Sequence, residues 1–434
     1  MDTPQTGAPH TAAELRVLKR ITPPKTLPAI VGKTLTKVEE AIKARQELAT
    51  VALGGSIAKG TYLKGDHDID VFVRFSPDYD DATLADRLQA ILESVFDSVE
   101  RVHGSRDYFH VLLDDFVFEF IPVLHISSWQ EARNVTDMSP LHVDYVAQHT
   151  GERPWLAGEI RLTKQFCKAA KVYGAESYIG GFSGHVVDLL NIHYGGFRQL
   201  LEAAAQWPAR VVLDPERQLD NPLTELNDAK IQAPLVIVDP VQQDRNSAAA
   251  LTQQAFARFK ARAAEYLAAS EDEQEAYFTI EPLDAAQFAA EYPGSRIIAV
   301  TLTPQRGKKD VVGAKCYKVY QHIWQQLVEH NFAVHASTWE FSPARTLLLF
   351  ALEYGLLSKE EELAGPPVHR TTDVARFQTA HETTYAREGK VYALETRKFR
   401  DPVKLIEHFL SQEYVLERVK ASRCKPIKGD DASE

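Results

Sequence analysis

The chain has 434 residues, of which 44% are hydrophobic and 25% are charged, as expected for a globular protein of about three or four domains. No run approaches the roughly 20 apolar residues of a membrane span, no signal peptide is indicated, and three widely spaced cysteines exclude a disulfide framework and favour the cytoplasm. The formal net charge of −11 argues mildly against a protein coated with nucleic acid, although a local basic groove stays compatible with it.

The first predicted elements are two helices and a short strand. Residues 1–10 are expected to form a disordered tail, and a helix is predicted at 11–20. A second helix at 34–48 carries apolar residues at helical spacing, which indicates one buried face. A strand at 51–53 then leads into a turn rich in glycine.

This turn and the strand after it carry the first signal of chemistry. Gly54, Gly55 and Ser56 form a small-residue turn whose backbone N–H groups can face a phosphate. Asp68 and Asp70 lie two apart in an apolar run that reads as a strand, so both carboxylates project from one face. Hard anionic oxygens beside a phosphate-binding turn suit Mg²⁺ carrying a nucleoside triphosphate.

A hairpin predicted at 106–123 supplies a third acid. Its returning strand places three phenylalanines on one face and Glu119 on the other. A lone Glu in such a strand is often an edge charge that keeps the sheet soluble. The pair of carboxylates upstream favours a different interpretation, in which Glu119 completes a two-metal phosphoryl-transfer site.

From residue 136 the pattern changes to long helices. A helix predicted at 159–173 bears Arg161, Lys164, Lys168 and Lys171 within about one quadrant of its surface. Such a stripe is either a solvated basic face or, beside a triphosphate site, a source of phosphate clamps. In the second case Lys164 and the phenol of Tyr173 would contact the β- and γ-phosphates.

The remaining sequence predicts α+β modules. The charged segment 271–275 is the best domain boundary, and beyond it strands and helices alternate around the basic loop 306–309. We therefore expect an α/β (α+β) multidomain fold. Its parts are a catalytic head at 1–135, a helical neck at 136–270, an α+β body and tail at 271–421, and a disordered end at 422–434.

Several motifs resemble a known family. Gly-Ser followed by Asp-x-Asp is typical of the DNA polymerase β nucleotidyltransferase superfamily. The resemblance extends to the archaeal-type (class I) CCA-adding tRNA nucleotidyltransferases, in family order over nearly the whole chain. The further matching segments are 137–142, 163–166 through 172–176, 181–184 with 193–195, 239–240 with 245–246, and 365–367.

This resemblance implies a polymerase-β-like head with a mixed sheet and Mg²⁺-dependent addition of C, C and A to tRNA from CTP and ATP. It makes Asp68, Asp70 and Glu119 the catalytic metal ligands. The residues that it assigns to nucleotide binding are Gly55, Ser56, Lys59, His142, Lys164, Tyr173 and Arg245, the last reading the base. It assigns tRNA binding to the basic loop with Lys308 and Lys309 and to the segment with Gly365 and Pro366, and it is compatible with a homodimer.

Three positions depart from the family pattern. Lys59 stands where relatives have Arg, Glu119 where they usually have Asp, and Met138 where they have Arg. The departures keep two alternatives open beside CCA addition. One is a paralogous RNA 3′-nucleotidyltransferase with A-only or C-only specificity or a repair role. The other is a tRNA-binding protein whose head has decayed, against which the three retained, mutually repelling acids argue.

Overall fold

The computed structural model describes residues 10–24, 26, 28–66, 68–353 and 355–427, and it divides into compact units at 1–281 and 282–434. The charged segment 271–275, predicted as the best domain boundary, contains the short helix α11 (Glu271–Gln274), which packs on α1 (Ala12–Ile21) in the first unit. The Nε of Arg16 donates to Glu275 at 2.7 Å, which fastens this segment to α1. None of the helices in the described residues is long and apolar enough to cross a membrane.

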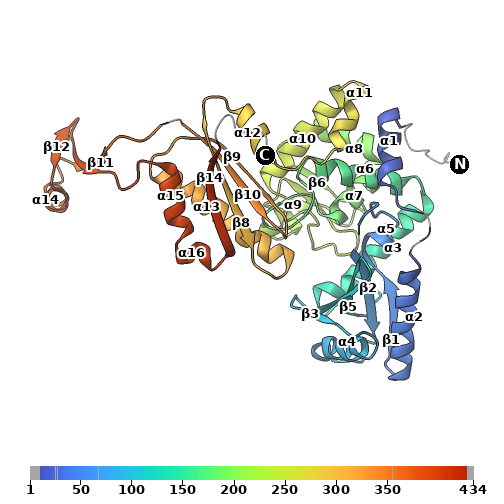
Figure 1. Ribbon diagram of the computed structural model, residues 1–434. Coiled ribbons are helices and arrows are strands. Elements are labelled where there is room, and N and C mark those ends of the chain that lie inside the picture. The colour runs from blue at the N-terminus through green and yellow to red at the C-terminus, as the bar shows by residue number, and fades with distance from the viewer. Residues whose placement is uncertain (1–9, 25, 27, 67, 354, 428–434) are drawn as a thin grey trace. The chain divides into compact units, whose positions relative to one another are not determined.

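The head is a mixed five-stranded sheet, as the sequence predicts, with two helices over one face (Figure 1). Its order is β1 (Ala49–Leu53), β2 (Asp68–Phe75), β5 (Phe116–Leu124), β4 (Tyr108–Leu113) and β3 (Glu100–Val102). Among the described residues of this sheet, β2 and β5 pair in parallel and the other neighbouring strands pair antiparallel. Apolar residues of β2 and β5 pack under α2 (Ala29–Ala44) and α4 (Leu84–Glu93), so the acids between them face the other side.

The neck continues the first unit as a group of helices around an aromatic core. Its main helices are α5 (Ser139–Glu152), α6 (Leu156–Ala169), α7 (Gly184–Tyr194), α8 (Phe197–Ala205) and α10 (Gln253–Ala268). The rings of Phe166, Phe197 and Tyr266 pack edge to face, which fixes the crossing of α6, α8 and α10. A small parallel pair, β6 (Val211–Leu213) and β7 (Leu235–Ile237), completes the neck.

One predicted boundary in the neck is wrong. Helix α6 ends at Ala169, and Lys171 adopts a left-handed conformation with φ of 56°. The predicted basic stripe therefore consists of Arg161, Lys164 and Lys168 only. The helix ends early because the chain turns at 170–173 to run beside Phe182, to which Tyr173 pairs through a parallel bridge.

The second unit contains an antiparallel sheet with helices on both faces, in agreement with the predicted α+β fold. The sheet order is β14 (Val419–Ile427), β8 (Arg296–Pro304), β10 (Thr346–Leu352) and β9 (Val334–Phe341). Helices α13 (Lys309–Glu329) and α15 (Pro402–Leu410) cover one face, and α12 (Ala285–Glu291) packs on the other.

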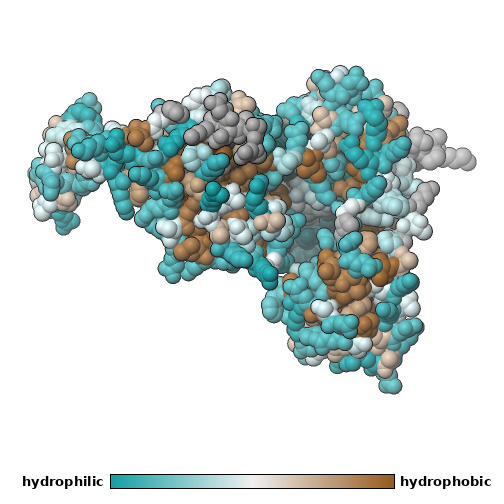
Figure 2. Space-filling view, viewed as in Figure 1, coloured by the Kyte–Doolittle hydropathy of each residue, from teal (hydrophilic) through white to brown (hydrophobic). Residues whose placement is uncertain are grey.

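A smaller sheet in the same unit buries little. It comprises β11 (Glu360–Pro367), β13 (Lys390–Thr396) and β12 (Thr384–Arg387), with α14 (Thr371–Ala380) beside it. No residue of α14 is buried, and hydrophilic residues cover most of this module's surface in Figure 2. The module therefore presents polar surface rather than a core.

The chain ends differ in part from prediction. Residues 422–427 belong to β14, so the expected disordered end is wrong for that stretch. Pairing with β8 gives their backbone groups partners despite the polar sequence. The predictions for 1–9 and 428–434 lie outside the described residues.

Candidate active site

Three carboxylates meet on the open face of the head sheet. The parallel register sets Asp70 of β2 directly opposite Glu119 of β5, and Asp68 lies two residues before Asp70. Asp68 is exposed, and about a third of the Glu119 side chain is exposed. Because side chains alternate along each strand, all three acids project to the same side.

The glycine turn lies directly against one of these acids. Gly54 N–H donates to the carbonyl of Asp70 at 2.8 Å, and a Cβ at Gly55 would overlap Oδ2 of Asp70. Gly55 also has φ of +53°, which disfavours any residue with a Cβ. Gly55, the first residue of the short helix α3 (Gly55–Ala58), is therefore needed to admit the Asp70 carboxylate, whereas a Cβ at Gly54 would meet the ring of Phe72.

The electrostatics of these acids suit a divalent cation. Burial, followed by the charges of Glu119 and Asp68, raises the pKa of Asp70 to about 6, and Lys59 opposes this shift. Negative charge is thus crowded at oxygen donors, which are the ligands that hard cations such as Mg²⁺ prefer. His110 of β4 lies beside the group, and its hydrogen bond to Glu119 raises the pKa of the imidazole.

Two predicted nucleotide-binding lysines belong to a buried network between head and neck. Lys164 is 3% exposed, and its Nζ donates to Oγ1 of Thr61 at 2.9 Å and lies 3.5 Å from Asp188. Lys59 Nζ donates to Asp188 of α7 at 2.9 Å. Burial opposes ionisation of the Asp188 carboxyl, but the ammonium groups of Lys164 and Lys59 lower its pKa. Both lysines therefore have protein partners.

The rest of the basic stripe contacts the loop that joins α3 to β2. Arg161 donates to the carbonyls of Gly60 and Tyr62, at 2.5 and 3.0 Å. Lys168 donates to Asp66 at 3.3 Å. The stripe thus fastens the neck to the head loop rather than forming a wholly solvated face, and a contact of Lys164 with phosphates stays a prediction.

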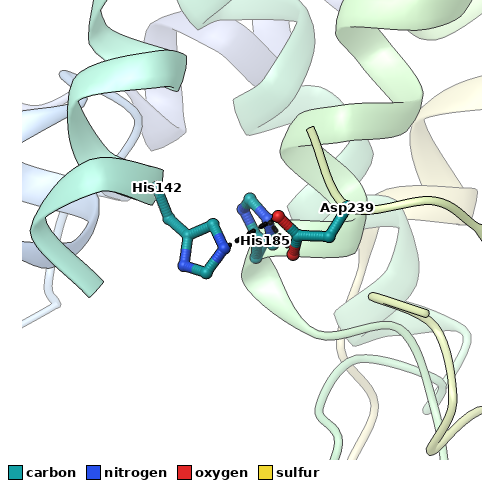
Figure 3. A group of neighbouring side chains, drawn as sticks. All are labelled: His142, His185 and Asp239. Atoms are coloured by element: carbon teal, nitrogen blue, oxygen red, sulfur yellow. Dashed lines mark hydrogen bonds and ion pairs between the residues drawn. The ribbon is translucent and has the colours of Figure 1, made fainter. Parts of the chain in front are cut away.

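A second polar cluster lies in the neck and is drawn in Figure 3. His142 of α5 and His185 of α7 lie 2.9 and 3.5 Å from the carboxylate of Asp239, and their ring centroids are 4.6 Å apart. Arg245 also donates to this carboxylate. Burial lowers the pKa of His185 to about 4. Although burial opposes ionisation, the hydrogen bond from His142 and the nearby His185 ring lower the pKa of Asp239.

The ligand atoms of this cluster lie within 4.8 Å of one another, as in a metal site. However, Oδ1 of Asp239 already accepts from the backbone N–H groups of residues 241 and 242, at 3.0 and 3.2 Å. Its Oδ2 accepts from Ser247 Oγ at 2.9 Å and from the Arg245 guanidinium. Arg245 therefore occupies the place beside Asp239 that a metal cation would need. The cluster is better suited to holding His142 and Arg245 in place than to binding a metal.

Sequence reasoning assigned no role to Asp188, His185, Asp239 or His110. Asp239 appeared only as part of a matching motif, and Asp188 is a single acid in an apolar helix, which a search for buried charges could have found. Met138 follows Asp137, whose carboxylate forms a buried ion pair with Arg106 at 2.5 Å. The pair shows that Arg106 supports the fold of the head.

The predicted tRNA-binding residues lie in the second unit. Lys308 occupies the position just before α13 and Lys309 is its first residue, whereas Gly365 and Pro366 lie in β11 of the small sheet. A Cβ at Gly365 would lie 2.7 Å from the ring of Phe377, so the glycine allows α14 to pack closely on β11. The residues thus come from two separate modules.

Comparison with known proteins defines the class of the head. A nucleotidyltransferase domain model matches residues 35–145. Among solved structures, the Cid1 poly(U) polymerase with Mg and 3′-dATP bound has a TM-score of 0.51 and 12% identity. The match covers 62% of this chain and 98% of that one, and the likeness is one of fold. The head is a polymerase-β-like nucleotidyltransferase fold.

Most of the chain is matched more specifically. The second domain of tRNA nucleotidyltransferase matches residues 158–279, and the C-terminal domain of the CCA-adding enzyme matches 293–419. The CCA-adding enzyme of Nanoarchaeum equitans is 30% identical over 371 residues, which are 85% of this chain and 89% of the relative. That of Methanosarcina acetivorans is 28% identical over 429 residues, 94% of this chain and 91% of the relative. The chain belongs to the family of CCA-adding enzymes.

Proposed function

We propose that this protein adds CCA to the 3′ end of tRNA from CTP and ATP, without a nucleic-acid template. The observation that carries the proposal is the in-register pair of Asp70 and Glu119 beside the Gly54–Gly55 turn. This is a carboxylate site on a nucleotidyltransferase head, in a chain related to CCA-adding enzymes over 85% of its length. The reaction is transfer of a nucleotidyl group to the terminal ribose hydroxyl.

In this proposal Asp68, Asp70 and Glu119 hold Mg²⁺, for which their crowded oxygens and the raised pKa of Asp70 are suited. Mg²⁺ bound there would supply Lewis-acid activation of the 3′-hydroxyl and neutralise charge on the triphosphate. The residues of the chain orient this site. Gly55 admits the Asp70 carboxylate, and the parallel strands fix its separation from Glu119.

The nucleotide contacts divide into direct and supporting roles. Ser56 directly follows Gly55, against which the Asp70 carboxylate lies. Direct contacts with the triphosphate, ribose and base are assigned to Ser56, Tyr173, His142 and Arg245. Asp239 supports the last two, since its carboxylate accepts from both. Lys59 and Lys164 are assigned a supporting role, in which their contacts with Asp188 and Thr61 fix the start of the loop at 60–66.

The second unit is proposed to grip tRNA through Lys308, Lys309 and the segment with Gly365 and Pro366. Recognition of RNA by backbone and shape suits an enzyme that must accept every tRNA, and the hydrophilic small module is compatible with this role. A cytoplasmic location agrees with the three free cysteines. A homodimer stays a prediction that light scattering would check.

The decisive assay uses tRNA that ends at the discriminator base, with each nucleotide alone and with CTP plus ATP. Sequenced products should end in CCA, with C added before A and little use of UTP or GTP. No extension, or equal use of all four nucleotides, would contradict the proposal. The exposed Asp115 in the hairpin turn provides a control for substitutions of the acids proposed to bind Mg²⁺, because Asp115→Asn should leave the pattern of products unchanged.

A second candidate is a related RNA 3′-nucleotidyltransferase with A-only or C-only specificity. The longer acid at Glu119 favours it, because a shifted metal ligand would alter how the nucleotide sits. Products that stop after C residues, or that contain only A, would identify this activity. A decayed tRNA-binding protein would instead show binding without incorporation at any Mg²⁺ concentration.

A further inference from the structure

A row of four polar residues crosses the open face of the head sheet. In register, Asp70 of β2 pairs with Glu119 of β5, Glu119 pairs with His110 of β4, and His110 pairs with Glu100 of β3. Residues directly opposite on neighbouring strands lie on the same face, with side chains within reach of one another. His110 is therefore the neighbour of Glu119 on the side away from Asp70.

The distances from the two ring nitrogens of His110 show which carboxylate each nitrogen faces. His110 Nε2 lies 3.2 Å from Oε2 of Glu119, and its Nδ1 lies 4.0 Å from Oε2 of Glu100. An ionised carboxylate only accepts hydrogen bonds, so Nε2–H donates to Glu119. About a third of each side chain in this pair is exposed, so the contact is reachable by solvent but not fully screened.

Glu119 needs such a partner more than a shorter acid would. A glutamate has one more rotatable bond than an aspartate, so its carboxylate can occupy more positions relative to Asp70 and loses more entropy when fixed. A hydrogen bond from a neighbour restricts this freedom before any cation binds. Partners of this kind around metal ligands orient the ligand and tune the metal affinity.

We propose that His110 is a positioning residue that holds the Glu119 carboxylate beside Asp70 and thereby strengthens divalent-cation binding at the carboxylate site. The inference rests on the proposed function only in taking Asp68, Asp70 and Glu119 as cation ligands. It assigns His110 no contact with substrate. It also explains how this chain tolerates a glutamate, since the donor on β4 compensates for the longer side chain.

The test measures Mn²⁺ binding to the full-length protein by electron paramagnetic resonance, without tRNA or nucleotide. Asp70→Asn should remove the site and so identify it. His110→Ala should weaken Mn²⁺ binding on the order of tenfold. His110→Gln keeps an N–H donor and should recover part of this loss. His103→Ala is the matched control, because His103 is 88% exposed and contacts Asp107.

A double-mutant cycle decides whether His110 acts through Glu119. In a Glu119→Gln background, His110→Ala should have little further effect on Mn²⁺ affinity. Unchanged affinity in His110→Ala, or an equal loss in both backgrounds, would overturn the inference. Thermal unfolding of each variant identifies any general loss of fold. If His110→Ala does not fold, the Mn²⁺ affinity of His110→Gln is compared with that of wild type and of His110→Gln in the Glu119→Gln background. Failure of wild-type protein to extend tRNA while it binds Mn²⁺ would instead count against the proposed function alone.

Discussion

Asp70 and Glu119 face each other across β2 and β5, the only parallel strand pair in the described part of the head sheet. The two acids are 49 positions apart in sequence and come together only because the strands pair in this register. Burial first, and then the repulsion from Glu119 and Asp68, raises the pKa of Asp70. A fold that keeps this arrangement without a bound cation bears an electrostatic cost, which is typical of functional sites.

Asp70→Asn is expected to abolish nucleotide incorporation. Removing one carboxylate should lower kcat by about three orders of magnitude, because the cation that it helps to hold supplies several kcal/mol of transition-state stabilisation. Affinity for tRNA, measured by filter binding, should stay nearly unchanged, since the proposed tRNA contacts are basic residues of the second unit, distant in sequence from Asp70. Loss of tRNA binding together with activity would indicate a structural role.

Gly55→Ala should inactivate the enzyme with little loss of stability elsewhere. The new Cβ would overlap the Asp70 carboxylate, and the positive φ adds strain of about 1 kcal/mol. Displacing a catalytic group by about 1 Å can cost roughly 100-fold in rate. Gly32→Ala in α2 is the control, because nothing lies within 4 Å of a Cβ there. Wild-type activity in Gly55→Ala would show that the Asp70 position is not critical.

Asp239→Asn tests the support of His142 and Arg245. Asparagine keeps the shape but loses the charge that holds both side chains, so kcat/KM for CTP and for ATP should fall about tenfold. The balance between C and A addition should also change, because Arg245 is assigned to the base. Asp244→Asn in the same loop, where the side chain is about half exposed, should behave as wild type. Equal kinetics in Asp239→Asn and Asp244→Asn would show that Asp239 does not support His142 and Arg245.

His185 should make the neck less stable in acid. Burial first, and the charges of His142 and Lys59, hold its pKa near 4 in the folded protein against 6.5 in the unfolded chain, although Asp239 opposes this. Between these values the unfolded chain binds more protons, so stability is full above pH 6.5 and falls as pH drops toward 4. The loss attributable to His185 is about 3 kcal/mol.

This pH effect is measured as a difference, because other groups titrate in the same range. Urea unfolding of wild type and His185→Gln from pH 7.5 to 4.5 should show wild type losing stability relative to the variant as pH falls. His103→Gln, at an exposed position, should follow wild type throughout. Parallel curves for wild type and His185→Gln would contradict the prediction.

Local pattern predicted the strands and the glycine turn that carry the acids of the head, but not β3 or the pairing of β2 with β5. Period-2 alternation in β2 and β5 placed Asp68, Asp70 and Glu119 on the outer face, since backbone geometry alone sets that alternation. The glycine turn was also evident, because only glycine accepts the positive φ and close approach at residue 55. Small errors arose at helix ends, such as α6 stopping at Ala169, where a later strand bridge redirects the chain.

The sequence by itself thus determined the fold class and the family resemblance and predicted Asp68, Asp70 and Glu119 as one site, because strand alternation and ordered motifs are readable from residue types along the chain. Only the tertiary structure decided that Lys59 and Lys164 share Asp188, that Asp239 holds His142 and Arg245, and that His110 contacts Glu119. These partners come from different helices, strands and loops. Their pairing depends on how the elements pack and register, which local spacing does not encode.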